Sequence, residues 1–183
     1  MKKRFGGMMV LAAVLAAGSL SPAVQARDWK PKAATLAQNY AEIVDGSKKG
    51  ELTVLFWFPA PMFEGKPKVQ DMVNRYVIIG AVHAKLNADD LLMPVHIDSL
   101  QALDGNGKAL NAIAQDKLPP NVVTFLAAFG SVMSQSLGVV GKGMQYFVFN
   151  AGDVNACKKG GMSIPFNGEV YTYNTPIPGC PVP

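Results

Sequence analysis

The feature that most constrains the fold of this chain is a long stretch without charge, which runs between Lys117 and Lys142. Pro120 suits the first turn of a helix, because proline fixes φ and its missing N–H is not needed there. Apolar residues then recur at steps of three and four, which is typical of one face of an α-helix. An aromatic, β-branched run at 144–150 follows and is typical of a strand. The pattern predicts a helix over residues 120–137 that lies on a sheet.

The opposite stripe of this helix carries small neutral groups where a solvated helix normally carries Lys and Glu. Its polar members are Asn121, Thr124, Ser131 and Gln135. The simplest interpretation is a helix packed on the sheet, with this stripe partly covered by a loop. Because charge depletion marks the core of protein interfaces, the four residues are alternatively a contact face for another protein. A membrane span is a third interpretation, but these polar side chains argue against a transmembrane segment in the mature chain.

The first 26 residues have the pattern of a secretory signal peptide. Three basic residues at positions 2–4 precede an apolar run over 8–20, and small residues at positions 24 and 26 suit cleavage ahead of Arg27. We therefore expect residues 27–183 to be exported as a single globular domain. Its compartment would be the periplasm in a cell with two membranes, and the outside of the cell otherwise.

Removal of the signal peptide also removes most of the positive charge. The whole chain has 17 basic and 13 acidic residues, and the signal peptide holds three of the basic ones and none of the acidic ones. The remaining 14 basic and 13 acidic residues give a net charge of +1. The mature chain therefore has no electrostatic basis for binding nucleic acid or anionic lipid.

Two cysteines, Cys157 and Cys180, lie in the exported part. Because an exported chain meets an oxidising environment, we predict that they form a disulfide. Closing this loop would stabilise the fold by about 3 kcal/mol and would anchor a proline-rich carboxy-terminus. A redox role is disfavoured, because the spacing is not C-x-x-C.

The rest of the chain alternates short apolar runs with turn residues. Strands are expected at 52–58, 76–86, 95–103, 108–114 and 144–150, and in a hairpin of 162–166 and 169–173, with shorter helices at 33–44 and 69–76. The pair Asn167-Gly168 is preferred in the type I′ turn of such a hairpin, and strand 52–58 is apolar on both faces, which predicts cover on both sides. Because strands mostly follow one another through short turns, the class is α+β, a mainly antiparallel sheet of about six or seven strands with one long helix packed on it. A β-sandwich with helical insertions is the alternative.

Two histidines are the candidates for chemistry. If 76–86 and 95–103 form a hairpin, the register in which paired numbers sum to 179 places His83 opposite His96, with Asp98 on the same face as His96. Two imidazoles and a carboxylate suit a divalent metal such as zinc or copper. Surface histidines are the simpler interpretation, because no short-spacing ligand motif is present. We therefore expect no cofactor, with a divalent metal as the alternative.

A small hydrolase is a further alternative. Ser99 lies close in sequence to His96 and Asp98. The chain lacks a G-x-S-x-G motif, however, and successive strand positions point to opposite faces.

Four stretches, VLFWFPAPMF, YVIIGAVHAKL, ALDGNGKAL and PPNVVTFLAAFGSVMSQSLGVVGKGMQYFVFNA, resemble a group of exported bacterial proteins with no assigned activity. The resemblance covers most of 27–183 and carries no catalytic motif. It implies a bacterial envelope setting and brings no functional residues to this chain. The sequence therefore favours a non-enzymatic, partner-binding or envelope-associated module, with a metal-binding protein that uses His83 and His96, or a small hydrolase, as alternatives.

Overall fold

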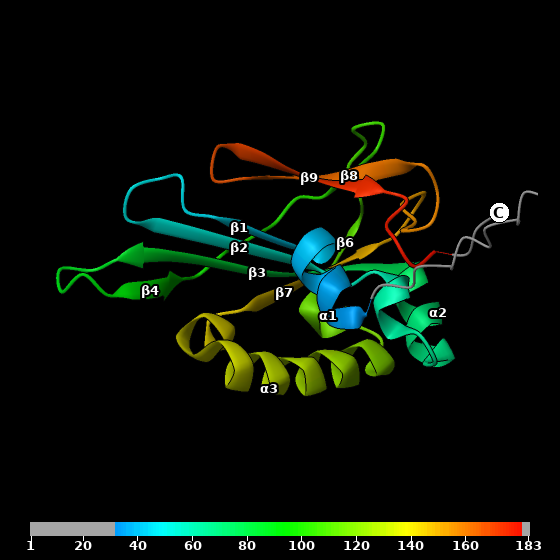
Figure 1. The fold of residues 1–183 in the computed structure, drawn as a ribbon, viewed down its shortest axis with the longest axis horizontal. Helices are drawn as coiled ribbons and strands as arrows, with labels where there is room; N and C mark the ends of the chain where they lie inside the picture. Colours follow the sequence, from blue (N-terminus) through cyan, green and yellow to red (C-terminus); the bar gives the residue numbers. More distant parts are fainter. Residues whose placement is uncertain (1–31, 181–183) are drawn as a thin grey trace, which may run out of the picture.

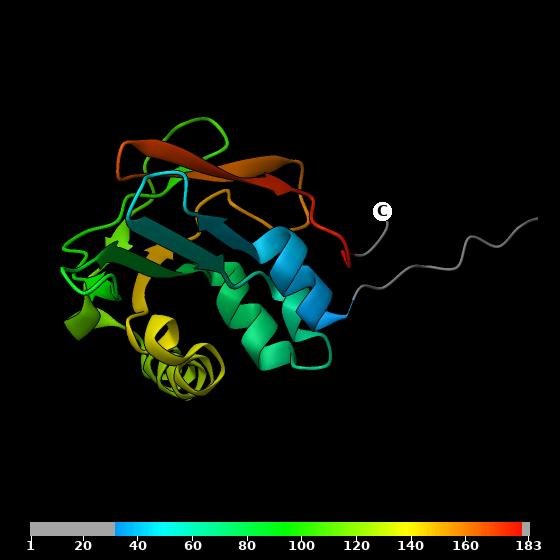
Figure 2. The same ribbon diagram turned by 60° about the vertical axis from the view of Figure 1, so that its left-hand side comes forward.

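The computed structural model describes residues 32–180, so the expected signal peptide lies outside the described residues. Nine strands form two antiparallel sheets, and helices cover one face of the larger sheet. Figures 1 and 2 show three layers, with the small sheet at the top, the large sheet in the middle and the helices α2 and α3 below. The α+β class is confirmed. The expected hairpin of 162–166 and 169–173 lies in the second sheet, which faces the first as in a sandwich.

The large sheet is built around its longest strand. In spatial order it contains β1 (Glu42–Asp45), β2 (Glu51–Trp57), β3 (Tyr76–Leu86), β7 (Gln145–Asn150) and β6 (Ala112–Ile113). Strand β4 (Leu92–Val95) also pairs with β3. Because β7 pairs only with residues 76–81 of β3, the second half of β3 is free to pair with β4.

The small sheet contains β5 (Leu103–Asp104), β8 (Gly160–Phe166) and β9 (Glu169–Thr175). Strands β8 and β9 form the expected hairpin. Asn167 and Gly168 have φ values of 51° and 80°, and a type I′ turn needs positive φ at both positions.

The helical elements are α1 (Ala33–Leu36), a π-helix η1 (Ala37–Ala41), the 3₁₀ turns η2 (Ala60–Phe63) and η3 (Gln115–Lys117), α2 (Pro67–Arg75) and α3 (Pro120–Lys142). The helix expected at 33–44 ends at Ala41. The residues after it form β1 instead, because the β-branched pair Ile43 and Val44 joins the ladder with β2.

Strand β2 and the residue after it show that the large sheet is covered on both faces. Leu55 and Trp57 point to the small sheet, whereas Val54, Phe56 and Phe58 point to the helices, and all five are at most 5% exposed. Two cores result, a sheet–sheet core above the large sheet and a sheet–helix core below it. The prediction that 52–58 is covered on both sides is confirmed.

The strand expected at 95–103 is wrong. Strand β4 ends at Val95, and the next seven residues have no regular structure until β5. The N–H of Ile97 donates to a side chain, Gln145 Oε1, at 3.1 Å rather than to a neighbouring strand. Ile97 and Leu100 are nevertheless buried in the sheet–sheet core, so this apolar run fills the core without pairing.

Candidate partner-binding surface

The inner face of α3 holds the helix on the large sheet through apolar contacts. Val122 is fully buried, and Leu126 and Met133 are each 8% exposed. Phe125 and Phe129 pack edge-on around Phe58, at ring-centroid distances of 5.7 and 4.5 Å. The predicted apolar stripe is therefore confirmed over these positions.

The outer face of α3 is not covered. The four predicted interface residues are all exposed, so the interpretation that a loop covers this stripe is wrong. The Thr124 hydroxyl donates to the carbonyl of Pro120 at 2.9 Å, and Gln135 Nε2 donates to Ser131 Oγ at 3.2 Å. Both bonds stay inside the helix, so part of the polar character of this face is already satisfied and less desolvation is needed to cover it.

Aliphatic side chains lie among these neutral groups. Val123 is 48% exposed, Val132 55% and Val139 59%. Gly138, with φ 55° and ψ −124°, breaks the helix where the sequence predicted its end, and the last turn folds back so that Gly141 meets the carbonyl of Met133. The outward face therefore combines apolar and neutral polar groups over almost the whole helix.

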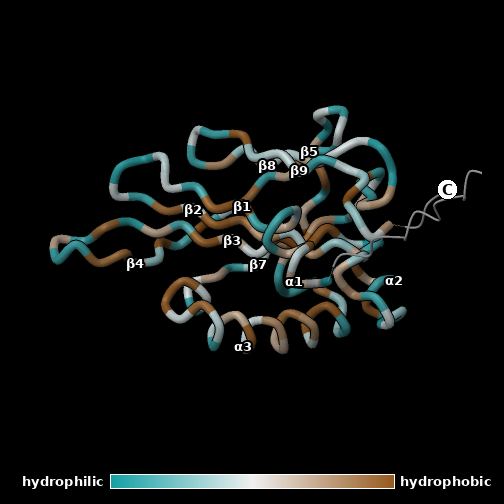
Figure 3. The backbone as a smooth tube through the Cα atoms, in the orientation of Figure 1, coloured by the Kyte–Doolittle hydropathy of each residue, from teal (hydrophilic) through white to brown (hydrophobic). Residues whose placement is uncertain are grey.

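The hairpin of β3 and β4 extends this apolar surface. Its exposed large apolar side chains are Leu86, Leu91, Leu92, Met93 and Val95. The hairpin adjoins the end of α3, because a Cβ added to Gly143 would lie 2.5 Å from Pro94 Cβ. Figure 3 shows the apolar colouring along β4 and on turns of α3.

We call this region the α3–β4 surface. Its apolar members are Leu86, Leu91 and Leu92 of the hairpin together with Val123, Val132, Leu137 and Val139. Met93 and Val95 are paired with Lys85 and His83, so their side chains point to the other face of the sheet. The seven members of this surface are more than half of the twelve exposed large apolar side chains found in the described residues. Exposed apolar residues scattered singly are normal, but a concentration in adjoining elements marks an interaction site.

The composition of α3 also meets the length and hydropathy criteria for crossing a membrane. An 18-residue window of the helix has a mean hydropathy of 1.6, and only 11% of that window is buried. A helix in the core of a soluble protein can pass the same test, but such a helix is mostly buried. The low burial shows that packing within residues 32–180 explains only part of the apolar character of α3.

The predicted meeting of the two histidines is wrong. His83 on β3 is opposite Val95, so paired numbers sum to 178 rather than 179. Because successive side chains in a strand point to opposite faces, a slip of one residue removes His96 from the face of His83. His96 instead follows the end of β4, and its Nε2 lies 3.7 Å from Asp98 Oδ1, with the two side chains 79% and 97% exposed.

His83 is 7% exposed and has a different carboxylate neighbour. Its Nε2 lies 3.8 Å from Glu51 Oε2, its ring meets Phe166 edge-on at 5.7 Å, and its Nδ1 is buried without a hydrogen bond. The Glu51 carboxylate accepts a 2.8 Å hydrogen bond from Asn167 Nδ2 and lies 3.1 Å from Lys85 Nζ. These contacts, the bond from Asn167 first, lower the pKa of Glu51 from its ordinary value of 4.5. This polar cluster holds the β8–β9 turn against β2 and β3.

The geometry that motivated metal binding is therefore absent. Among residues 32–180, no group of three or more His, Cys, Asp or Glu side chains is arranged to hold a metal ion. The hydrolase alternative also lacks an assembled site, because Ser99 has no hydrogen bond to His96 or Asp98 within the described part of the chain.

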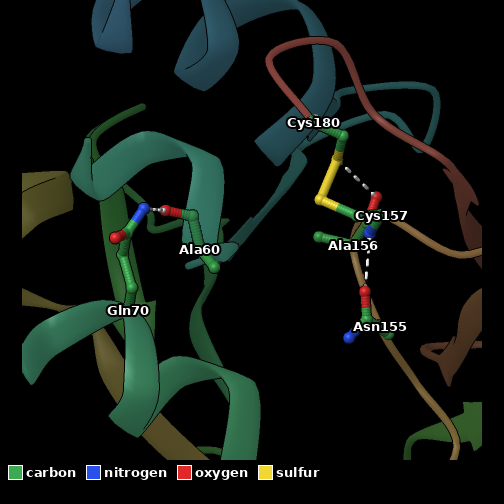
Figure 4. The surroundings of a disulfide bond; sticks show 6 residues. All are labelled: Ala60, Gln70, Asn155, Ala156, Cys157 and Cys180. Atoms are coloured by element: carbon green, nitrogen blue, oxygen red, sulfur yellow. Dashed lines mark hydrogen bonds between the residues drawn. A yellow bond between two sulfur atoms is a disulfide. The ribbon is translucent and has the colours of Figure 1, made fainter. Parts of the chain in front are cut away.

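The predicted disulfide between Cys157 and Cys180 is present, with Cα atoms 5.3 Å apart (Figure 4). The Cys157 N–H donates to Asn155 Oδ1 at 2.8 Å, and the Ile177 N–H donates to the carbonyl of Ala156 at 2.9 Å. The disulfide and these bonds join the segment after β9 to the loop before β8.

Sequence analysis missed the hairpin half of the α3–β4 surface. The run Leu91-Leu92-Met93 resembles a core strand, because short apolar runs are usually buried. Asp89 and Asp90 immediately before it are the available signal, since a strand that begins beside two acids and contains Pro94 is expected at a solvent-facing edge.

No protein-family model, curated protein or solved structure matches this chain. The function is therefore argued from the residues themselves.

Proposed function

We propose that this chain is an exported, non-enzymatic binding protein that docks a protein partner of the bacterial envelope through the α3–β4 surface. The observation that supports the proposal most directly is the exposed outer face of a 23-residue helix without an ionisable side chain from position 118 to 141. A face without charged groups is only weakly hydrated, so covering it costs little desolvation free energy. Charge depletion is also typical of the core of a protein interface.

A protein partner suits this surface better than a lipid bilayer. Asp89 and Asp90 stand at the tip of the β3–β4 hairpin, where they would be repelled by anionic lipid headgroups. The aromatic residues of α3, Phe125 and Phe129, face the sheet, so they are not available as anchors at a membrane interface. The exposed amide and hydroxyl groups of α3 suit hydrogen bonds to another protein.

The export setting rests on the signal peptide pattern, on the resemblance to exported bacterial proteins and on the disulfide, which suits an oxidising compartment. Amino-terminal sequencing of the protein recovered from the periplasm or medium should begin at Arg27. Recovery of the full-length chain in the cytoplasm alone would contradict this part of the proposal.

Site-specific photo-crosslinking in cells that export the chain tests the docking surface. A photoreactive side chain in place of Val132 or Val123 should form a covalent adduct with one defined protein. The same group in place of Thr172, an exposed residue of β9 on the opposite layer, is the matched control and should form no such adduct. The partner, once purified, should bind the wild-type protein at least about tenfold more tightly than Val132→Lys, because an unpaired charge would have to be buried.

Two results would contradict the proposal. The first is an equal adduct from Val132 and Thr172, which would show that the contact is not specific to α3. The second is flotation of the purified mature chain with phosphatidylglycerol-containing vesicles that is lost in Val132→Lys, which would identify the α3–β4 surface as a lipid-binding face.

A further inference from the structure

An open, polar cavity of about 150 Å³ lies on the small-sheet layer, away from the α3–β4 surface. One wall is the turn that follows β5, and the other is formed by the loop 153–159 and the first two residues of β8. The turn lies beside β8 because Asp104 is paired with Met162 (Figure 1). The side chains that matter for ligand chemistry are Asp104, Asp153, Lys158, Lys159 and Thr175.

Both walls are held in place before any ligand binds. Asp104 Oδ1 accepts hydrogen bonds from the N–H groups of Asn106 and Lys108, each at 2.9 Å. On the opposite wall, Asn155 Oδ1 fixes the N–H of Cys157, whose disulfide closes the loop. A site that is ordered in advance loses less conformational entropy on binding.

Buried polar side chains are concentrated here. The polar or charged side chains buried in the described chain are Thr53, His83, Asp104 and Thr175. Thr53 and His83 are opposite each other on β2 and β3, whereas Asp104 and Thr175, 7% and 9% exposed, both line the cavity.

Side chains of both signs line the cavity without neutralising one another. The lining residues include two aspartates, Asp104 and Asp153, and two lysines, Lys158 and Lys159, of which Asp104 is buried and the other three are exposed. None of the ion pairs found in residues 32–180 joins any of these four side chains. A simple anion would be repelled by the carboxyl groups and a metal cation by the lysines, so the lining matches a ligand that carries both charges.

The volume restricts the ligand to a small molecule. A water molecule takes about 30 Å³ of liquid, so the cavity holds roughly five waters. Pockets for drug-sized ligands occupy about 300–1,000 Å³. An α-amino acid with a small side chain fits the volume and carries an ammonium group and a carboxylate group on the same carbon atom.

We propose that this cavity binds a small zwitterion of the α-amino acid class. The ligand ammonium group contacts the carboxyl of Asp153, and its carboxylate contacts Lys158 and Lys159. The site is independent of the α3–β4 surface, because the two lie on opposite layers of the fold.

Nuclear magnetic resonance titration of the isotope-labelled, oxidised mature protein tests the proposal. The probe is L-alanine, with propionate and ethylamine as analogues that each lack one of its charges. L-Alanine should shift the amide signals of residues 104–107 and 158–161 in a saturable way. Propionate and ethylamine should each need at least about tenfold higher concentration for half-saturation, because each analogue lacks one ionic contact with the cavity.

Two variants assign the contacts. Asp153→Asn should weaken binding of L-alanine about tenfold and leave the weak binding of propionate unchanged, whereas Lys158→Gln/Lys159→Gln should weaken both. Asp71→Asn and Lys68→Gln on α2 are matched controls that do not line the cavity and should change neither. The proposal is overturned if L-alanine gives no saturable shift, or if propionate binds as tightly as L-alanine and Asp153→Asn has no effect.

Discussion

The two faces of the large sheet are covered in different ways. The small sheet above it shares an apolar core with the large sheet and is attached by directional bonds as well. The Tyr171 hydroxyl donates to Asp45 Oδ2 at 2.7 Å, Asn167 donates to Glu51, and a disulfide ties down the segment after β9. Helix α3 below it rests on apolar contacts, and its two side-chain hydrogen bonds stay within the helix.

The outer surfaces of the two coverings differ as well. The exposed positions of β9 are polar except for Val170, whereas those of α3 include Val123, Val132 and Val139. The solvent-exposed surface of β9 is therefore mostly polar, whereas the solvent-exposed surface of α3 is partly apolar. Within residues 32–180, the inner side of α3 is packed on the sheet, whereas its outer side is exposed although it is partly apolar.

The largest effect should follow from Phe58→Ala, because this fully buried ring is the centre of the contacts with Phe125 and Phe129. We expect a loss of about 3–5 kcal/mol in the free energy of unfolding, measured by denaturant titration. Amide hydrogen exchange should accelerate in α3 more than in β9, since the ring supports only the lower layer. Equal acceleration in both elements would show that the two layers do not differ in this way.

The disulfide should have the next largest effect. Cys157→Ser/Cys180→Ser should lower the free energy of unfolding by about 3 kcal/mol, because an open loop gives the unfolded chain more conformations. Exchange should now accelerate at β9 and in the loop before β8, with α3 unchanged. Reduction of the wild-type protein is the control and should reproduce the loss, whereas a faster exchange of α3 would contradict the separation of the layers.

Local patterns in the sequence predicted much of this fold. The apolar residues on both faces of 52–58 predicted a strand covered on both sides, Asn167-Gly168 predicted a type I′ hairpin, and two cysteines in an exported chain predicted the disulfide. Each of these signals needs only neighbouring residues or a single pairing rule. The division of the strands between two sheets depends on long-range pairing, which local patterns do not specify.

The candidate site was predicted only in part for the same reason. Helical periodicity predicts that Asn121, Thr124, Ser131 and Gln135 share the stripe opposite the apolar face, and all four are exposed there, whereas their role in an interface stays a prediction. The β3–β4 register depends on its loop, where the side chain of Asn87 accepts the N–H groups of Asp89 and Leu91. A one-residue difference in such a loop exchanges the faces of a whole strand, which separated the two histidines and exposed an apolar run.

Acid should weaken the polar attachment of the upper layer. The pKa of Glu51 is lowered by the bond from Asn167, and the pKa of Asp45 is lowered by the bond from Tyr171, while burial and the Asp45 bond raise the pKa of Tyr171 to about 12. A carboxyl with a lowered pKa in the folded state stabilises the fold above its ordinary pKa and loses that contribution as pH falls.

We expect the thermal midpoint to decrease between about pH 5 and pH 3. The accompanying loss of free energy of unfolding should be smaller than the loss caused by Phe58→Ala or by removal of the disulfide. Glu51→Gln should have a lower midpoint at pH 6 and a shallower decrease on acidification, whereas Asp71→Asn on α2 should retain the wild-type slope. An unchanged slope for Glu51→Gln would show that this carboxylate does not secure the β8–β9 turn.

The smallest effect on stability should come from a substitution on the outward face of α3. Two adjacent residues, one on each face of the helix, allow this effect to be measured separately. Val132 is 55% exposed and Met133 is 8% exposed, so the two side chains share a backbone and differ in the face that they occupy. Val132→Lys should change the free energy of unfolding by at most about 0.5 kcal/mol, because a lysine there reaches water. Met133→Lys should cost at least about 2 kcal/mol, because its charge would be buried without a partner.

Denaturation at several protein concentrations makes this pair decisive. If Val132→Lys is neutral at every concentration, the outward face is free in the isolated protein and remains available for a partner. If Val132→Lys is as destabilising as Met133→Lys, and only at high protein concentration, then a second copy of the chain already covers α3. That result would replace the heterologous partner by self-association, since mass action makes the stability of an oligomer depend on concentration.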